Sequence, residues 1–163
     1  MAYQHKNVYW LWISAAVMLL DQITKQLVVK NLSWYDVWPL APGFNLVHMR
    51  NTGAAFSILR DAPPAFFILL GVGVSLGILW WLRKNPTGQT ILAVGLSLIL
   101  GGALGNVIDR AARGYVVDFL DFYAWGWHYP SFNVADMAIT TGAGLLILDM
   151  VLESRRLKQQ DGG

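Results

Sequence analysis

Cysteine is absent from the 163 residues, and charged residues are scarce. The missing thiols exclude disulfide bridges, thiolate catalysis and cysteine-ligated metal sites. Aspartate, glutamate, lysine and arginine together make up 13% of the chain, against roughly 25% in soluble domains. The net charge of +2 and the lack of long basic runs argue against a nucleic-acid partner. Much of the surface is therefore expected to face something other than water.

Several familiar catalytic motifs are also missing. The three histidines lack the spacing of a zinc motif such as His-Glu-x-x-His. The chain contains no Gly-x-Ser-x-Gly nucleophile elbow and no Gly-x4-Gly-Lys-Ser/Thr phosphate loop. We therefore expect no metal and no cofactor.

What the chain does contain is apolar sequence, at 55% of all residues. A membrane helix needs about 20 mostly apolar residues, and four windows qualify: 8–29, 65–82, 90–108 and 134–152. The second and third are rich in glycine, which lets helices approach closely in lipid. The first window is long, carries Asp21 and Lys25 near its far end and is followed by no small-x-small cleavage site, so an uncleaved span is expected. The length fits a single domain over residues 1–163.

Basic residues predict the orientation of these spans, because lysine and arginine concentrate in cytoplasmic loops. The N-terminus, the connection between the second and third windows and the C-terminal tail share one side of the membrane. These segments carry basic residues at higher density: Lys6, Arg83, Lys84, Arg155, Arg156 and Lys158. Both termini are therefore expected in the cytoplasm. The two segments on the outer side are then 30–64 and 109–133. The first contains the β-prone stretch 44–48 and a turn at 51–53, which predicts a small strand or hairpin.

Charges near the ends of the spans are costly and therefore informative. Asp21 and Lys25 are four residues apart, in the favourable order for an ion pair on one helix face. The pair is either structural or a brace for an active-site loop. Asn106 and Arg110 share a face one turn apart at the end of the third window. Such a polar face implies a wet or protein-lined groove.

Asp118 and Asp136 form the sharpest constellation, with Asp121 nearby. Both lie in apolar sequence at the outer ends of the last two spans, which are consecutive and antiparallel. An acid at a helix start such as Asp136 can also serve only to complement the helix dipole. Two carboxyls in one site of low dielectric constant share a proton and titrate as a unit. That state suits peptide hydrolysis, because one carboxylate activates water while the other polarises the carbonyl.

Four blocks of sequence, in order, resemble bacterial lipoprotein signal peptidase, the signal peptidase II family. They are Asp21-Gln-Ile-Thr-Lys25, then residues 50–57 (Arg-Asn-Thr-Gly-Ala-Ala-Phe-Ser), then Gly105-Asn106-Val-Ile-Asp109-Arg110 running on to Val117-Asp118-Phe119, and last Phe132-Asn133-Val-Ala135-Asp136. Each block alone is a weak signal. All four in this order, over nearly the whole chain, are specific.

The resemblance implies an aspartic endopeptidase that removes signal peptides from prolipoproteins, cutting before a diacylglyceryl-modified cysteine. Asp118 and Asp136 match the catalytic aspartates. Asn51 and Arg110 would hydrogen-bond the substrate backbone. Asn106 and Asn133 would orient the aspartates. The remaining supporting positions are Gly53 at a close turn, Ala135, and the brace of Asp21 and Lys25.

The same resemblance implies the surroundings of the site. It predicts a membrane all-α fold of four transmembrane helices, with a small extracytoplasmic β-cradle and an outer loop or short helix around residues 123–129. The expected location is the bacterial inner membrane, with the active site at the outer face. The expected partners are prolipoprotein substrates and membrane lipid, and the chain is expected to act as a monomer.

Two other functions compete with this interpretation. Membrane acids also serve small transporters and channel subunits, but those favour acids at mid-bilayer and an internal repeat, and no repeat is visible here. Arg113-Gly114 followed by Asp118 faintly resembles a phosphatidyltransferase pattern. The Asp-Gly pair that this pattern requires earlier in the sequence is missing.

Overall fold

The computed structural model describes residues 7–53, 62–84 and 88–161. Lys6 and residues 54–57 of the second motif lie outside the described residues. The elements in chain order are η1 (Asn7–Trp10), α1 (Leu11–Asn31), β1 (Val37–Ala41), β2 (Phe44–Asn51), α2 (Pro64–Lys84), α3 (Thr90–Arg113), β3 (Val116–Ala124), β4 (Trp127–His128) and α4 (Val134–Asp161).

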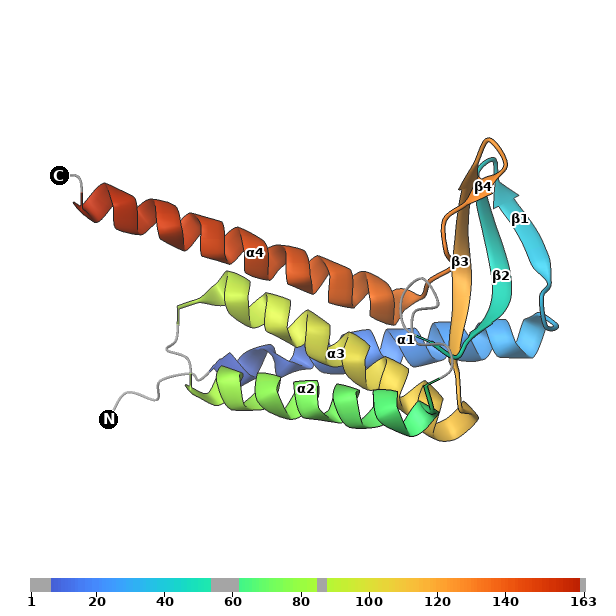
Figure 1. The fold of residues 1–163 in the computed structure, drawn as a ribbon, viewed down its shortest axis with the longest axis horizontal. Coiled ribbons are helices and arrows are strands. Elements are labelled where there is room, and N and C mark those ends of the chain that lie inside the picture. The colour runs from blue at the N-terminus through green and yellow to red at the C-terminus, as the bar shows by residue number, and fades with distance from the viewer. Residues whose placement is uncertain (1–6, 54–61, 85–87, 162–163) are drawn as a thin grey trace.

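The four α-helices are each long and apolar enough to cross a membrane. They run along the long axis of the molecule, and the strands lie across one end of the bundle (Figure 1). This confirms the expected fold of four membrane helices with a small sheet. The helices extend past some of the expected limits, since α3 continues to Arg113 and α4 to Asp161. The last turns of both helices are polar, so they fall outside windows that are defined by apolar composition.

Helix α3 lies at the centre of the bundle and packs against α1, α2 and α4. Its apolar window is 44% buried, whereas those of the other helices are 17%, 22% and 22% buried. Glycine allows the close contact with α4. A Cβ on Gly102 would collide with the carbonyl oxygen of Ala135, and one on Gly142 would lie 2.6 Å from the carbonyl oxygen of Gly95. These contacts bring the start of α4 against α3, where the candidate site lies.

We expect Gly102→Ala to lower the stability of the folded protein by about 1–3 kcal/mol, the usual cost of overpacking a tight contact. The matched control is Gly73→Ala in α2, because a Cβ at Gly73 meets nothing within 4 Å. Thermal unfolding in detergent measures both variants. Equal midpoints for the two would contradict the role of Gly102 in this helix contact.

The sheet is four-stranded and antiparallel, in the order β1-β2-β3-β4. Gly114, with φ of 81°, ends α3 in the left-handed conformation and turns the chain into β3. In the register between β2 and β3, Met49 lies opposite Asp118 and Asn51 lies opposite Val116. The pairing therefore brings the motif that contains Asn51 beside the motif that contains Asp118.

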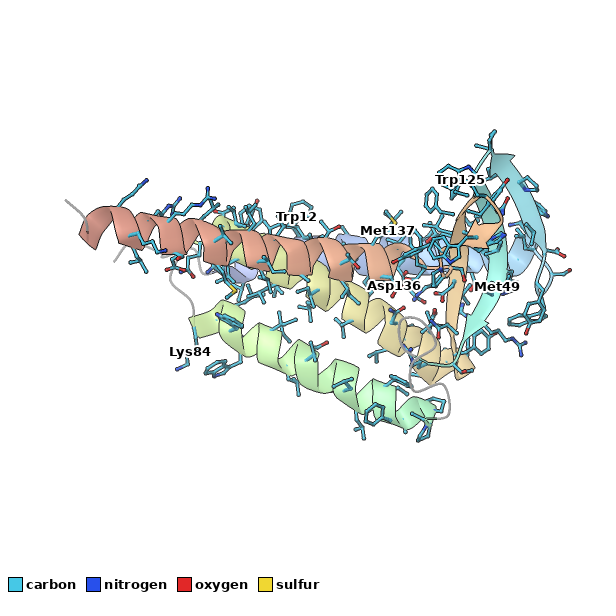
Figure 2. The ribbon with its side chains drawn as sticks, turned by 45° about the horizontal axis from the view of Figure 1, so that its top comes forward. Trp12, Met49, Lys84, Trp125, Asp136 and Met137 are labelled. Carbon is cyan, nitrogen blue, oxygen red and sulfur yellow. The ribbon has the colours of Figure 1, made fainter. Side chains whose placement is uncertain are left out.

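The outer strands differ from the central pair in burial. All five residues of β1 are exposed, and Pro39 is tolerated there because β1 is an edge strand. The expected loop or short helix around residues 123–129 takes the form of a tight turn between β3 and β4. Trp125 and Gly126 have φ of 49° and 78°, as a two-residue hairpin turn requires. Figure 2 shows Trp125 near the tip of this hairpin.

Candidate active site

Asn133 connects the two candidate catalytic aspartates. It precedes the first residue of α4 and caps that helix: its Oδ1 accepts the backbone N–H of Asp136 at 2.9 Å, and Asp136 Oδ2 accepts the N–H of Asn133 at 3.3 Å. This reciprocal arrangement resembles a capping box. Asn133 Nδ2 also donates to Asp118 Oδ1 at 2.7 Å. One fully buried side chain therefore positions both acids.

Asp118 projects from β3 with only 2% of its surface exposed. Its second carboxylate oxygen accepts a hydrogen bond from Asn51 Nδ2 of β2 at 3.0 Å. Asp136 is half-buried in the first turn of α4, at the end of α4 nearest the sheet (Figure 2). The sheet thus presents one acid and the helix presents the other.

The environment of Asp118 favours its protonated form. Burial raises the pKa of Asp118 from its ordinary value of 3.8 to about 7, and the negative charge of Asp136 adds to the increase. Hydrogen bonds from Asn51 and Asn133 and the charge of Lys25 lower the pKa and oppose part of this rise. A carboxyl with such a pKa can hold a proton near neutral pH and release it during a reaction.

Asn106 fixes the second acid from the side of α3. Its Nδ2 donates to Asp136 Oδ1 at 2.9 Å, and its Oδ1 accepts a hydrogen bond from Lys25 Nζ at 2.9 Å. An ammonium group can only donate, so Lys25 requires the amide oxygen of Asn106. The amide nitrogen then faces Asp136.

Lys25 lies at the centre of a buried ion cluster. Its Nζ is 2.8 Å from Asp21 Oδ2 and 2.9 Å from Asp109 Oδ2, and all three side chains are inaccessible to solvent. Asp21 Oδ1 also accepts the backbone N–H of Ala135 at 2.9 Å. Asp109 Oδ2 accepts the N–H of Val117 at 3.1 Å. The cluster therefore holds both the start of α4 and the start of β3, one residue from each catalytic candidate.

Asp109 is part of the third sequence block, but the sequence alone assigned it no role. It is fully buried, and Arg113 and Gln22 also bind it. A signal was available, because Asp109 shares one helix face with Gly102 and Gly105. A glycine face predicts close packing, so an acid on that face is expected to be buried and paired.

Asp121, by contrast, lies outside the site. It accepts a hydrogen bond from Asn45 Nδ2 at 2.8 Å and lies 3.0 Å from His128 Nδ1. It belongs to the outer part of β3, away from Asp136. The three-acid constellation therefore divides into one pair and one separate residue.

Arg110 and Gly53 form the edge of the site on the other side of Asn51. Gly53 N–H donates to Asn51 Oδ1 at 3.0 Å, which closes the expected turn. Arg110 Nη2 donates to the carbonyl oxygen of Gly53 at 2.6 Å, and its guanidinium carbon lies 4.6 Å from the centre of the Phe67 ring. Arg110 Nε is buried without a partner in the described part of the chain.

All ten residues singled out in the sequence are connected by these hydrogen bonds and ion pairs. Asn51, Asn106, Arg110, Asp118 and Asp136 also line a cavity of about 950 Å³. The cavity is polar where it meets the sheet. It becomes apolar between α2 and α4, where its walls include Leu70, Val74 and Ile139. Within the described residues, no group of three or more His, Cys, Asp or Glu side chains is placed to hold a metal ion.

Comparison with known families decides the class of protein. The family model described as signal peptidase (SPase) II matches residues 13–152. The chain belongs to the signal peptidase II family. As a signal peptidase II it is an aspartic endopeptidase and a multi-pass membrane protein. The family membership expected from the four sequence blocks is confirmed.

Similar proteins extend over most of this signal peptidase II chain. The lipoprotein signal peptidase of Alteromonas mediterranea is 45% identical over 163 residues, which cover 98% of this chain and 90% of the relative. That of Histophilus somni strain 2336 is 53% identical over 143 residues, 86% of this chain and 87% of the relative. A bacterial membrane enzyme solved by the in meso method at 2.3 Å resolution superposes with a TM-score of 0.83 and 31% identity, over 90% of this chain and 89% of the other. The individual roles of the ten site residues stay predictions.

Proposed function

We propose that this signal peptidase II removes the signal peptide from diacylglyceryl-modified prolipoproteins, cutting before the lipidated cysteine, with Asp118 and Asp136 as the catalytic pair. The observation that carries the proposal is that both carboxyls are hydrogen-bonded to Asn133 and line one cavity. The relatives' name, lipoprotein signal peptidase, supports the substrate class. The apolar part of the cavity suits a substrate whose acyl chains stay in the bilayer.

In this mechanism the pair holds one proton. Asp136, as carboxylate, takes a proton from the attacking water, whose oxygen bonds to the scissile carbonyl carbon. Asp118, as the acid, donates its proton to the carbonyl oxygen. When the tetrahedral gem-diol collapses, Asp118 takes a proton from one of its hydroxyl groups, the C–N bond breaks, and Asp136 gives its proton to the leaving amine, so the pair again holds one proton. Arg110 Nε, which is buried without a partner in the described residues, is available to bind a substrate carbonyl.

The pKa of Asp118 predicts the alkaline limb of the pH profile. Above about pH 7 this carboxyl loses its proton, the pair carries two negative charges, and the acid is lost. We expect kcat/KM to fall by about tenfold per pH unit on that limb. The hydrogen bond from Asn51 favours the ionised form, so Asn51→Leu is expected to move the limb to higher pH.

The matched control for this experiment is Asn45→Leu. Asn45 lies on the same strand but binds Asp121 rather than Asp118, so its loss should leave the limb in place. Stability should follow the same titration. Because the folded state holds the proton more tightly, stability falls as pH rises from 3.8 to about 7. If the alkaline limb of the kcat/KM profile stays at the same pH in Asn51→Leu, the assignment of Asp118 as the acid is contradicted.

We further propose that the sheet and the catalytic pair lie at the outer face, with both termini in the cytoplasm. The first turns of α1 and the last turns of α4 lie at the end opposite the sheet (Figure 1). Lys84 lies at that same end (Figure 2), as do the last turns of α4, which carry Arg155 and Arg156. Basic residues of this kind concentrate on the cytoplasmic side.

The segment after the β3–β4 hairpin is proposed to shield the reaction from water. Tyr129, Pro130, Ser131 and Phe132 all contribute to the cavity wall. Phe132 is fixed there, because its carbonyl oxygen accepts the backbone N–H of Leu120 at 2.9 Å. Excluding water strengthens the electrostatic interactions of the pair. The chain is proposed to act as a monomer, since one chain supplies both acids.

The test of function uses the purified protein and a synthetic prolipoprotein, with and without the diacylglyceryl group on its cysteine. Release of the signal peptide from the lipidated substrate alone is expected. Equal cleavage of both substrates would contradict the proposed substrate class. Ion flux in liposomes without any peptide release would favour the transporter hypothesis instead.

A further inference from the structure

Arg50 of β2 is a cation that lies over the ring of Trp34 and beside that of Tyr115, and these two rings contact each other edge to face. Its guanidinium carbon lies 3.2 Å from the centre of the Trp34 ring and 4.9 Å from that of Tyr115. None of the ion pairs in the described part of the chain involves Arg50. The side chain is exposed. A fixed, exposed cation without a carboxylate partner is suited to an external anion.

The position of the guanidinium is set by the fold. His48 and Arg50 are two residues apart on β2, so they share a face about 7 Å apart. Trp34 stacks on His48 with ring centres 4.3 Å apart, and its indole fills the space between the two. The linker that carries Trp34 is fastened to β2, because the N–H of Tyr35 donates to the His48 carbonyl at 3.0 Å. Little freedom remains to be lost when an anion binds.

The depth of this cluster is given by the helices on either side. Trp34 follows the last residue of α1 by three positions, and Tyr115 follows the last residue of α3 by two. Both helices are candidate membrane spans, and aromatic rings at span ends lie at the level of the lipid headgroups. The anion available at this level is the phosphate of a phospholipid. The planar fork of a guanidinium matches a phosphate well.

The cluster is separate from the catalytic pair. Successive side chains of a strand point to opposite faces, so the side chain of Arg50 points away from the face on which Asn51 binds Asp118. Arg50 contributes to the rim of the cavity, but its guanidinium lies over Trp34. We propose that Arg50, stacked on Trp34 and beside Tyr115, binds the phosphate of a bilayer phospholipid headgroup. This contact fastens the linker and β2 to the membrane surface beside the active site.

The test measures binding of dihexanoylphosphatidylglycerol, a short-chain phospholipid, to the full chain in maltoside detergent by isothermal titration calorimetry. We expect saturable binding, and at least about tenfold weaker binding in Arg50→Gln, as for the loss of a hydrogen bond to a charged group. The matched control is Lys30→Gln, an exposed residue in the last turn of α1. Lys30→Gln removes the same charge but does not disturb the aromatic contacts of Arg50, so the phospholipid affinity of this variant should stay within about twofold of the parent.

Further variants distinguish the effect of aromatic stacking on phospholipid binding from the effects of charge and of folding. Trp34→Leu keeps the cation but removes the stacking, and several-fold weaker binding is expected. Arg50→Lys keeps the charge without the planar fork, and intermediate binding is expected. Thermal unfolding verifies that each variant is folded. The proposal is overturned by equal losses in Arg50→Gln and Lys30→Gln, by unchanged binding in Trp34→Leu, or by equally tight binding of inorganic phosphate or of dihexanoylglycerol, which lacks the phosphate.

Discussion

Asp118→Asn and Asp136→Asn are each expected to abolish release of the signal peptide while the chain remains folded and inserted. Asparagine has nearly the same shape and can still accept a hydrogen bond from Asn133 or Asn106. It can neither hold the shared proton nor take one from water. Since general acid–base catalysis contributes about 10²–10⁴-fold per group, turnover of a lipidated prolipoprotein should fall at least about a thousandfold.

The matched control for these variants is Asp149→Asn, on the same helix as Asp136 but outside the residues that line the cavity. It should cleave at the parent rate. Binding of uncleaved substrate provides a second readout, because both active-site variants retain the cavity. Normal turnover in Asp118→Asn or Asp136→Asn would exclude the carboxyl pair as the catalytic device.

Lys25→Met is expected to produce the largest loss of stability. Lys25 is fully buried between Asp21 and Asp109, and Asp109 also pairs with Arg113, so removal of Lys25 leaves the buried carboxylate of Asp21 without a cation. Removing one partner of a buried ion pair costs about 3–5 kcal/mol. Thermal unfolding in detergent, together with the yield of folded protein, measures the loss.

Two comparisons make this second prediction specific. Lys30→Met removes an exposed lysine from the last turn of the same helix and should leave the unfolding midpoint nearly unchanged. Adding Asp21→Asn to Lys25→Met removes the carboxylate charge that has lost its cation and should restore part of the lost stability. If Lys25→Met unfolds like the parent, the cluster does not stabilise the fold.

The ion cluster and the catalytic pair depend on each other through short covalent and hydrogen-bonded links. Asp21 accepts a hydrogen bond from the N–H of Ala135, the residue before Asp136. Asp109 accepts a hydrogen bond from the N–H of Val117, the residue before Asp118. The buried charges therefore fix the backbone on which each acid stands. A change in this cluster alters the relative position of the two carboxyls without touching either of them.

Local patterns in the sequence were sufficient to predict the four membrane helices and one ion pair. The four spans follow from apolar composition over about 20 residues, and the Asp21–Lys25 pair follows from the spacing of one helical turn. The family followed from four motifs in order. The edge strand β1 was not predicted, because the exposed segment Val37–Ala41 lacks the alternation of apolar and polar residues that marks a half-buried strand.

The long-range partners could not be predicted in this way. Lys25 and Asn106 are 81 residues apart, Asn51 and Asp118 are 67 apart, and Asp21 and Ala135 are 114 apart. Periodicity reports only neighbours within one element, so it does not show which face of α1 meets which face of α3. For this reason the glycine face could have indicated that Asp109 is buried, but not that its partners are Lys25 and the N–H of Val117.

The sequence by itself determined that this chain has four membrane helices, belongs to the signal peptidase II family and carries two candidate acids near the ends of its last two spans. Only the tertiary structure decided that Asn133 links those acids, that Asn106 turns its amide nitrogen toward Asp136, and that Lys25 balances two buried carboxylates. The physical reason is that composition and spacing act along the chain. Hydrogen bonds and ion pairs in a buried site, in contrast, depend on distances between elements that are set only when the helices and the sheet pack together.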